Sequence, residues 1–465
     1  MNKLFGIIKR FFNEDEIKFS QESKVEMDSR KINEGDIFFA INNGNNHIKE
    51  VLLKNPSLII SDSKDVKIED KRIFYVGDTV KTMQDIARLY RRELKAKVIG
   101  ITGSNGKTTT KDILFSVVSK MGKAKKTFGN YNNHIGLPFT LLTTGEEIEY
   151  LILEMGMSDL GEIDLLCNIA QPDYGLITNI GITHIANLKN RETVFLAKTE
   201  MLKYVKNENM FVNSDDDLLE KINSNHVGFN MKNIINTEAG LFNYRLCDLD
   251  ETEGEQIFSF VEIIGNSDTK KSKIERYKMN LNGAYNTLNA GLVVALMGKI
   301  GASSKIIKEG LLNVELTPMR FEKNRYDGII CINDAYNASP ISMELGIKSF
   351  ENVYRNNYKI AIIADMLELG TDEITYHEKV LKEILLLEID EILLYGPIMG
   401  AAYKRISNIK TNVIFKEFSN KKILTEYLRD KLERLGKESA KDIALYLKGS
   451  RGMKLEEIIN VLFNK

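Results

Sequence analysis

The feature that most constrains the fold is a short apolar run that leads directly into a glycine-rich loop and a helical pattern. Residues 98–102 (VIGIT) predict a buried strand, and residues 103–109 (GSNGKTT) follow without a linker. Apolar residues then recur at helical spacing, at Leu114, Val117 and Val118. A strand, a tight glycine turn and a helix in this order are typical of a parallel α/β sheet.

The loop has the composition of a phosphate cradle. Its glycines let backbone N–H groups point inward, and the helix N-terminus adds partial positive charge. Lys107 is expected to reach the outer phosphates and Thr108 to ligate Mg²⁺. The loop departs from the strict G-x-x-x-x-G-K-[S/T] pattern, because residue 101 is Ile and only two residues separate Gly103 from Gly106. It predicts nucleoside triphosphate binding, with a ligand-free structural turn as the weaker alternative.

Composition excludes several classes of protein. The 465 residues, 43% hydrophobic and 28% charged, predict about three domains of about 150 residues. The 64 Lys and Arg balance the 65 Asp and Glu, so we expect no nucleic acid partner. Cys167, Cys247 and Cys331 form no C-x-x-C pair, which favours a reducing cytoplasm. No run approaches the roughly 18 apolar residues of a membrane span, and no cleavable signal is evident.

The N-terminus leaves two interpretations open. Its apolar residues share one helical face, and Lys3, Lys9 and Arg10 lie nearby. Such a face could rest on a membrane surface, but a segment of this length with few charges binds lipid weakly. We therefore favour a short first helix packed on its own domain and expect no stable membrane insertion. The apolar residues are Leu4, Phe5, Ile7, Ile8, Phe11 and Phe12.

Two changes in hydrophobic pattern divide the chain. A charged helical run over residues 84–97 ends before Val98, and a glycine-bounded helical stretch over 284–312 ends before Pro318. We expect domains at residues 1–95, 96–314 and 315–465. In the last third, helical stretches alternate with apolar runs, which predicts a parallel, doubly wound sheet. The runs are 328–332, 360–364, 391–395, 412–415 and 443–447.

The middle third starts in the same way and then changes character. From about Val227 to Met279 it becomes turn-rich and strand-like, without helical period, which predicts an antiparallel insert on an α/β core.

Three residues downstream of the loop stand where a ligand would lie. Glu154 ends an apolar strand and could hold Mg²⁺ from the carboxyl end of a sheet. His184 follows another apolar run at residues 176–181. Lys198 lies on a helical stretch, where a solvated surface lysine is the ordinary interpretation. Taken alone, a solvated Glu154 and a structural His184 are also the commoner outcomes.

Seven segments together resemble the Mur ligases of peptidoglycan synthesis, in family order and over nearly the whole chain. They are ITGSNGKTTTK (101–111), GNYNNHIGLP (129–138), EMGMSDLGEI (154–163), PDYGLITNIGITH (172–184), DAYNASPISM (334–343), DMLELG (365–370) and KGSRGM (448–453). The resemblance implies an α/β fold of three domains: an N-terminal domain for the UDP-sugar substrate, a central P-loop ATPase domain and a C-terminal Rossmann-like parallel-sheet domain.

It also implies the reaction. ATP would phosphorylate the terminal carboxylate of a UDP-N-acetylmuramoyl-tripeptide, and the amine of D-alanyl-D-alanine would displace phosphate to leave an amide, with Mg²⁺ as cofactor. These small-molecule substrates, a cytoplasmic location and a monomer are the corresponding expectations. The third residue of the tripeptide, lysine or diaminopimelate, stays open.

Matched residue by residue, the resemblance assigns catalysis to Lys107, His184 and Lys198 and the metal to Thr108, Glu154, His184 and Lys198, with Lys198 carbamylated by CO₂. It places ATP against Gly103, Asn105, Gly106, Lys107, Thr108, Thr109, Asn286, Asn289, Arg320, Asp334 and Tyr336. It places the other substrates against Ser29, Arg30, Asn132, Asn133, Asn337 and Arg451.

The match has three departures. The stretch 44–48 (GNNHI) is shorter than its family counterpart, which leaves the uridine contacts open, Tyr285 replaces a usual His, and Ala364 replaces a usual Gly. Two alternatives follow: a related ligase with another acid or amine substrate, and a non-catalytic ATP-binding regulatory module. The DMLELG and KGSRGM segments argue against the first alternative. The joint presence of Lys107, Glu154, His184 and Lys198 argues against the second.

Overall fold

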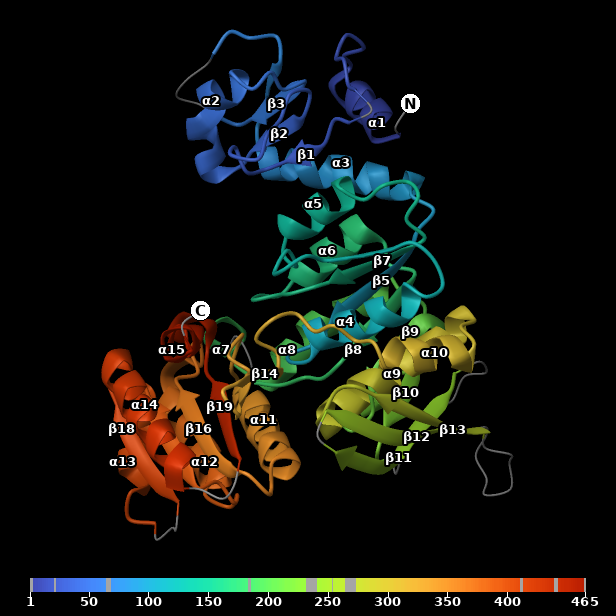
Figure 1. The fold of residues 1–465 in the computed structure, drawn as a ribbon. Helices are drawn as coiled ribbons and strands as arrows, with labels where there is room; N and C mark the ends of the chain where they lie inside the picture. Colours follow the sequence, from blue (N-terminus) through green and yellow to red (C-terminus); the bar gives the residue numbers. More distant parts are fainter. Residues whose placement is uncertain are drawn as a thin grey trace.

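The structure is a computed structural model of the chain. It describes residues 3–20, 22–63, 68–182, 185–230, 241–252, 254–263, 273–409, 413–438 and 442–463. These residues form three β-sheets with covering helices: one at the top of Figure 1, one in the middle and one at lower left. Within the described ranges, no helix is both long and apolar enough to cross a membrane.

The N-terminal sheet is parallel, in the order β1-β2-β3-β4. Phe38 and Ile59 pack with α2 on one face, while Phe39 and Ile60 join the core that contains α1 and α3. The strands are β1 (Val25–Glu26), β2 (Ile37–Ala40), β3 (Leu58–Ser61) and β4 (Ile73–Tyr75), and the helices are α1 (Lys3–Phe12), α2 (Ile48–Leu52) and α3 (Thr79–Glu93).

The amphipathic N-terminal segment packs on the protein itself. Phe5 and Ile8 are buried on the inner face of α1, and Phe5 stacks on Phe19 with ring centroids 4.6 Å apart. Helix α1 contacts α3 (Figure 1). The interpretation as a helix packed on its own domain is confirmed, because protein already covers most of the apolar face that a membrane would have to bind.

The central sheet runs β13-β12-β11-β10-β9-β8-β5-β7-β6. Its parallel part comprises β5 (Lys97–Thr102), β6 (Ala124–Lys126), β7 (Tyr150–Glu154), β8 (Tyr174–Ile177), β9 (Met210–Asn213) and β10 (Asn225–Gly228). Its antiparallel part comprises β11 (Asn243–Thr252), β12 (Glu255–Ile263) and β13 (Lys273–Met279). Its helices are α4 (Lys107–Val118), α5 (Gly136–Leu142), α6 (Glu162–Ala170), α7 (Ile185–Leu188), α8 (Arg191–Thr199), α9 (Ala284–Ile300) and α10 (Ser304–Leu311).

Alternation along the central strands builds two cores. Val98, Leu151 and Leu153 pack with α3, α5 and α6, while Ile99 and Ile152 pack with α4, α9 and α10. Side chains of successive strand residues point to opposite faces, so each buried strand supplies both cores and reads as a continuous apolar run. Helix α3 thereby joins the N-terminal and central sheets in one core, and the predicted boundary at 95/96 stays a prediction.

Three sequence-based boundaries need correction. The region 227–279 is antiparallel over β11, β12 and β13, as expected, but these strands extend the central sheet and form no separate insert. The antiparallel part also starts later than Val227, which lies in β10, a strand that pairs in parallel with β9 and β11. The helical stretch 284–312 is two helices, because Gly301 adopts φ 101° and ends α9. Helix α3 ends at Glu93, not at Lys97, since the chain must extend at Leu94 to enter the sheet.

The C-terminal sheet, in the order β14-β15-β19-β16-β17-β18, is parallel except for its edge strand β14, so the predicted parallel sheet is confirmed. Helices cover both faces, since Ile330 and Ala361 belong to one core and Cys331 and Ile362 to the other. The strands are β14 (Glu322–Tyr326), β15 (Ile329–Asn333), β16 (Tyr358–Ala364), β17 (Glu391–Tyr395), β18 (Ile414–Phe418) and β19 (Ile443–Lys448). The helices are α11 (Pro340–Val353), α12 (Glu373–Ile384), α13 (Pro397–Ile406), α14 (Lys421–Glu438) and α15 (Glu456–Leu462).

We predict that Ile8→Ala destabilises the protein, because Ile8 is fully buried between α1 and its neighbours. Such a truncation costs about 2–5 kcal/mol. Calorimetry should show the first unfolding transition several degrees lower. The matched control is Phe11→Ala on the same helix, whose side chain is 38% exposed and whose loss should shift the transition much less. Equal, small shifts for the two variants would contradict the packing described for α1.

Candidate active site

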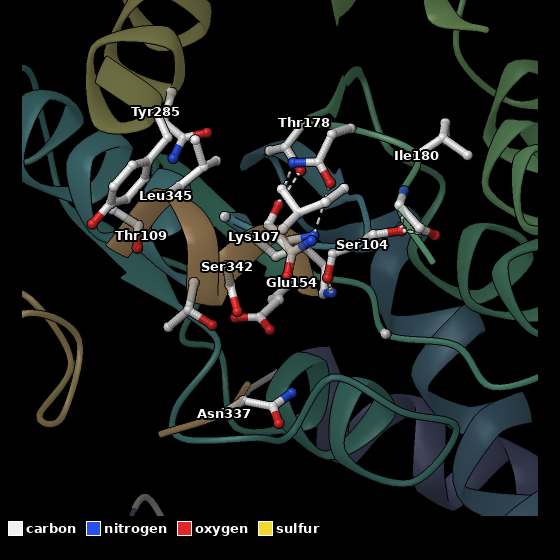
Figure 2. Close-up of a pocket in the computed structure, with 18 of the residues that line it drawn as sticks. Ser104, Lys107, Thr109, Glu154, Thr178, Ile180, Tyr285, Asn337, Ser342 and Leu345 are labelled. Carbon is white, nitrogen blue, oxygen red and sulfur yellow. Dashed lines mark hydrogen bonds between the residues drawn. The ribbon is translucent and has the colours of Figure 1, made fainter. Parts of the chain in front are cut away.

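A cavity of about 1020 Å³ opens at the carboxyl end of β5. Strand β5 lies between β7 and β8. The connection after β5 leads to β6 on one side and the connection after β8 leads to β9 on the other side, so a crevice forms between them. The cavity is lined by the loop after β5, by the ends of β7 and β8, by the start of α9, and by the C-terminal part from Arg320 to Leu345. Figure 2 shows Lys107 and Glu154 side by side at its centre, with Asn337 on one side and Tyr285 and Leu345 on the other.

The phosphate loop follows a path that only glycine allows. Gly103 has φ 146° and Gly106 has φ 82°, both in the range that side chains disfavour. A Cβ on Gly103 would lie 1.9 Å from Thr178 Oγ1, and a Cβ on Gly106 would lie 2.9 Å from Asn289 Oδ1. The loop therefore packs directly against the segment after β8 and against α9.

Hydrogen bonds hold this loop to the segment after β8. Thr178 Oγ1 donates to the Asn105 carbonyl at 2.5 Å, and the Asn105 N–H donates to Asn179 Oδ1 at 3.0 Å. The Gly181 N–H donates to Ser104 Oγ at 2.8 Å. These contacts fix the loop before any ligand binds, which is the preorganisation that a phosphate site requires.

Lys107 is the first residue of α4, and its Nζ donates to the Gly103 carbonyl at 2.6 Å. Burial lowers the pKa of Lys107, while the charge of Glu154 acts in the opposite direction. The ammonium group thus lies at the helix N-terminus, where an anion is favoured.

Glu154 ends β7 and is buried among cations. Its Oε1 accepts a hydrogen bond from Asn132 Nδ2 at 2.9 Å, and its Oε2 pairs with Lys111 Nζ at 3.3 Å. Burial acts to raise the pKa of Glu154, but Lys111, Lys107 and Arg320 outweigh it and the pKa falls. The carboxylate is therefore ionised and offers oxygen ligands.

The C-terminal part adds a cation to the phosphate loop. Arg320 Nη2 donates to Thr108 Oγ1 at 3.0 Å, and its guanidinium lies 4.2 Å from the centroid of the Tyr336 ring. Asp334 pairs with Lys448 Nζ at 2.6 Å and accepts from the Tyr446 hydroxyl at 2.9 Å. Asp334, Tyr336 and Arg320 therefore share one wall of the cavity.

Three polar atoms in residues that line the cavity are buried without a hydrogen-bond partner among the described residues. They are Asn105 Nδ2, Asn286 Oδ1 and Arg320 Nε. A buried unpaired polar atom costs about 1–3 kcal/mol, so these atoms point to a polar ligand.

Lys198 lies in α8 and is 1% exposed. Burial, together with the nearby charge of Lys107, holds the pKa of Lys198 well below its usual range. The ordinary interpretation of a solvated surface lysine is therefore wrong. His184 lies outside the described residues.

The cavity brings together most of the predicted site residues: Asn105, Gly106, Lys107, Thr108, Thr109, Asn132, Asn133, Glu154, Asn286, Asn289, Arg320, Asp334, Tyr336 and Asn337. Ser29 and Arg30 line a second cavity of about 600 Å³, with Gly44, His47 and Tyr131. Gly44 and His47, from the shortened stretch 44–48, thus lie beside Ser29 and Arg30, as in the family pattern. Arg451 lines neither cavity and pairs with Glu456 at 2.6 Å.

Several residues of the site escaped the sequence analysis. Thr178 and Asn179 lie inside the segment 172–184, but their contact with the phosphate loop depends on the pairing of β5 with β8. Lys111 stands inside the loop motif, and a lysine on the buried face of a helix is a signal that could have found it. Lys448, which belongs to KGSRGM, lines the central cavity in place of Arg451.

Comparison with known proteins agrees with this geometry. Residues 101–297 match the Mur ligase middle domain, and residues 319–451 match the Mur ligase, glutamate ligase domain. The UDP-N-acetylmuramoyl-tripeptide--D-alanyl-D-alanine ligase of Bacillus subtilis is 33% identical over 94% of this chain and 92% of its own length. The chain belongs to the Mur ligase family, in the branch of these D-alanyl-D-alanine ligases. The resemblance in the seven segments is thereby confirmed.

Solved Mur ligases have the same fold. A crystal structure of MurF from Acinetobacter baumannii has a TM-score of 0.82 at 23% identity and covers 99% of this chain and 98% of that one. MurF from Thermotoga maritima, solved in complex with ADP, has a TM-score of 0.78 at 26% identity and covers 95% and 97%. The predicted α/β Mur ligase fold is confirmed.

We predict that Gly103→Ala weakens nucleotide binding by at least about 10-fold, since the new Cβ would displace either Thr178 or the loop. Titration calorimetry with ADP measures the change. The matched control is Gly298→Ala, within α9, where a Cβ meets no atom within 4 Å. Unchanged ADP affinity in Gly103→Ala would contradict the close packing of the loop.

Proposed function

We propose that this chain joins D-alanyl-D-alanine to a UDP-N-acetylmuramoyl-tripeptide at the expense of ATP. The observation that carries the proposal is the meeting of the phosphate loop with Arg320 at Thr108, next to the ionised Glu154. Lys107 from the central part and Arg320 from the C-terminal part would both supply positive charge to a phosphate bound at the loop. In phosphoryl transfer, such a second cation stabilises the charge that develops on the transferred group.

The residues suit activation of a carboxylate. A carboxylate is a poor electrophile until one oxygen becomes a phosphate leaving group, so ATP first converts the acid to an acyl phosphate. Lys107 and Arg320 would stabilise the charge that develops on the transferred phosphoryl group. The incoming amine then attacks the acyl carbon, and the C–O bond to phosphate breaks to leave an amide, ADP and phosphate.

The donor set fits Mg²⁺. Thr108 offers a hydroxyl and Glu154 a carboxylate, and Mg²⁺ prefers oxygen ligands, with the remainder taken from water and phosphate oxygens. Bound Mg²⁺ would neutralise phosphate charge. A second metal would be held by His184 and by a carbamate on Lys198, as the family resemblance implies. A neutral Lys198 amine, favoured by its low pKa, is the form that reacts with CO₂ to give a carbamate.

The remaining substrates are assigned by position. Asn286 and Asn289, at the start of α9, would contact the base of ATP, and Asn132, Asn133 and Asn337 would meet the reacting substrates. The second cavity, with Ser29 and Arg30, would take the uridine end of the tripeptide substrate. Arg451 would need to release Glu456 before it could hold a substrate carboxylate.

The organisation proposed for this reaction keeps the three predicted domains, 1–95, 96–314 and 315–465, for the UDP-sugar substrate, for ATP and for the amine. The chain would act as a cytoplasmic monomer.

We predict phosphate release only when ATP, the tripeptide substrate and D-alanyl-D-alanine are all present. D-Ala, L-Ala and D-Glu should give rates lower by roughly 10²-fold or more, because a site shaped for a dipeptide leaves polar groups unpaired with a single amino acid. A phosphate assay with mass spectrometry of the product measures this. Equal turnover with a single amino acid would move the chain to another ligase branch, and no release under any condition would support the regulatory module.

We predict that Lys198→Ala lowers the ligation rate by roughly 10²–10³-fold, the usual cost of losing one electrostatic stabiliser. Added acetate or formate should restore part of the rate by replacing the carbamate. The control is Lys203→Ala, in the 3-10 helix that follows α8, where the exposed lysine pairs with Asp164 at 2.8 Å and should be dispensable. A lower ligation rate that acetate or formate does not restore would argue against the carbamate. A near-normal rate would show that Lys198 has no role in the reaction.

A further inference from the structure

One buried carboxylate beside the phosphate loop has no part in the function proposed above. Asp112 lies in α4 four residues after Thr108, so the two side chains share a face of the helix one turn apart. Asp112 is 1% exposed, and its Oδ1 pairs with Lys126 Nζ at 2.6 Å. This ion pair stays within the central part of the chain.

The other oxygen of Asp112 holds the segment that leads into the C-terminal part. Asp112 Oδ2 accepts from the Thr317 backbone N–H at 2.7 Å and from Thr317 Oγ1 at 2.8 Å. Hydrogen bonds to an ionised acceptor are stronger than those between neutral groups, and two donors from one residue fix its orientation. Thr317 is therefore bound to the helix that begins with Lys107.

Arg320 follows Thr317 by three residues and returns to the same helix. Its Nη2 donates to Thr108 Oγ1 at 3.0 Å. The α4 face formed by Thr108 and Asp112 thus contacts the segment from Thr317 to Arg320 at both of its ends. Asp112 binds Thr317, and Thr108 binds Arg320.

The backbone around Arg320 needs such external support. Met319 has φ 62° and Phe321 has φ 52°, so non-glycine residues on both sides of Arg320 adopt the left-handed conformation. The Met319 N–H donates to Glu322 Oε2 at 2.9 Å, and the Phe321 N–H donates to Asp334 Oδ1 at 3.1 Å. These bonds hold the segment from its C-terminal side, and Asp112 holds it from the N-terminal side.

We propose that Asp112 is a positioning residue, which anchors Thr317 so that Arg320 reaches the phosphate loop. The inference rests on the proposed function, in which Arg320 stabilises the transferred phosphoryl group. Asp112 itself touches no substrate in this scheme. Any effect of Asp112 on the ligation rate must therefore depend on the presence of Arg320. A residue that only stabilises the fold would show no such dependence.

A double-mutant cycle tests the dependence. Asp112→Ala should lower kcat by about 10-fold or more, because small misplacements of a catalytic group carry costs of this size. In an Arg320→Ala background the same substitution should change kcat by less than about 2-fold, since the group it positions is gone. Glu315→Gln, an exposed acidic residue two positions before Thr317, is the matched control and should behave as wild type.

A second readout measures the contact without catalysis. Hydrogen exchange of the peptide that contains the Thr317 amide should be slow in the wild type and in Glu315→Gln, and at least about 10-fold faster in Asp112→Ala. Thr317→Val, which keeps the backbone donor and loses the hydroxyl donor, should give an intermediate kcat. Calorimetry would show whether Asp112→Ala is folded, and an unfolded variant would be replaced by Thr317→Val in the cycle.

The outcomes are distinguishable. If the wild type releases no phosphate with the full substrate set, the proposed function fails, and the cycle is then run on the affinity for a non-hydrolysable ATP analogue. If the wild type is active and the effects of Asp112→Ala and Arg320→Ala multiply, or if Thr317 exchange is unchanged, the positioning role is overturned. Non-additive loss with faster Thr317 exchange supports it.

Discussion

The close approach of Gly103 to Thr178 is the contact on which the site depends. Strands β5 and β8 pair through residues 99–102 and 174–177, so the loop after one strand is pressed against the segment after the other. A side chain on Gly103 would overlap Thr178 Oγ1 at 1.9 Å. Because the loop is held there by Thr178 and Asn179, Lys107 starts α4 at a fixed place, and the first residues of that helix line the cavity.

Electrostatics then link parts of the chain that lie far apart in sequence. Glu154 stays ionised while buried because Lys111, Lys107 and Arg320 surround it, and Arg320 enters from beyond the central sheet. Removing a buried partner of such a carboxylate leaves an uncompensated charge, which costs several kcal/mol. The site therefore requires the C-terminal part to be held in place, and the contacts of Asp112 with Thr317 and of Asn105 with Ser339 both serve this requirement.

The N-terminal part is tied to the central part by packing and by the ion pair of Arg91 with Asp173 at 2.9 Å. Helix α3 packs against the first sheet and against α5 and α6, so one core runs through both units. The second cavity includes Tyr131 from the central part, and Asn132, the next residue, holds Glu154. A ligand bound beside Ser29 and Arg30 would thus lie near the loop that contacts the central carboxylate.

Local patterns in the sequence determined the secondary structure and much of the central cavity. The run from Val98 to Thr109 predicted strand, loop and helix, because strand burial, glycine turns and helix starts are set by neighbouring residues. The seven segments identified the family and contain eleven of the predicted site residues that line the cavity, and the family match added Asn286, Asn289 and Arg320. Only the tertiary structure decided the antiparallel extension of the central sheet, the burial of Lys198, the place of Arg451 outside the cavity and the contact of Asp112 with Thr317. No local pattern encodes these features, because burial and charge pairing arise only when the sheets have formed, and Asp112 and Thr317, for example, lie 205 residues apart in the sequence.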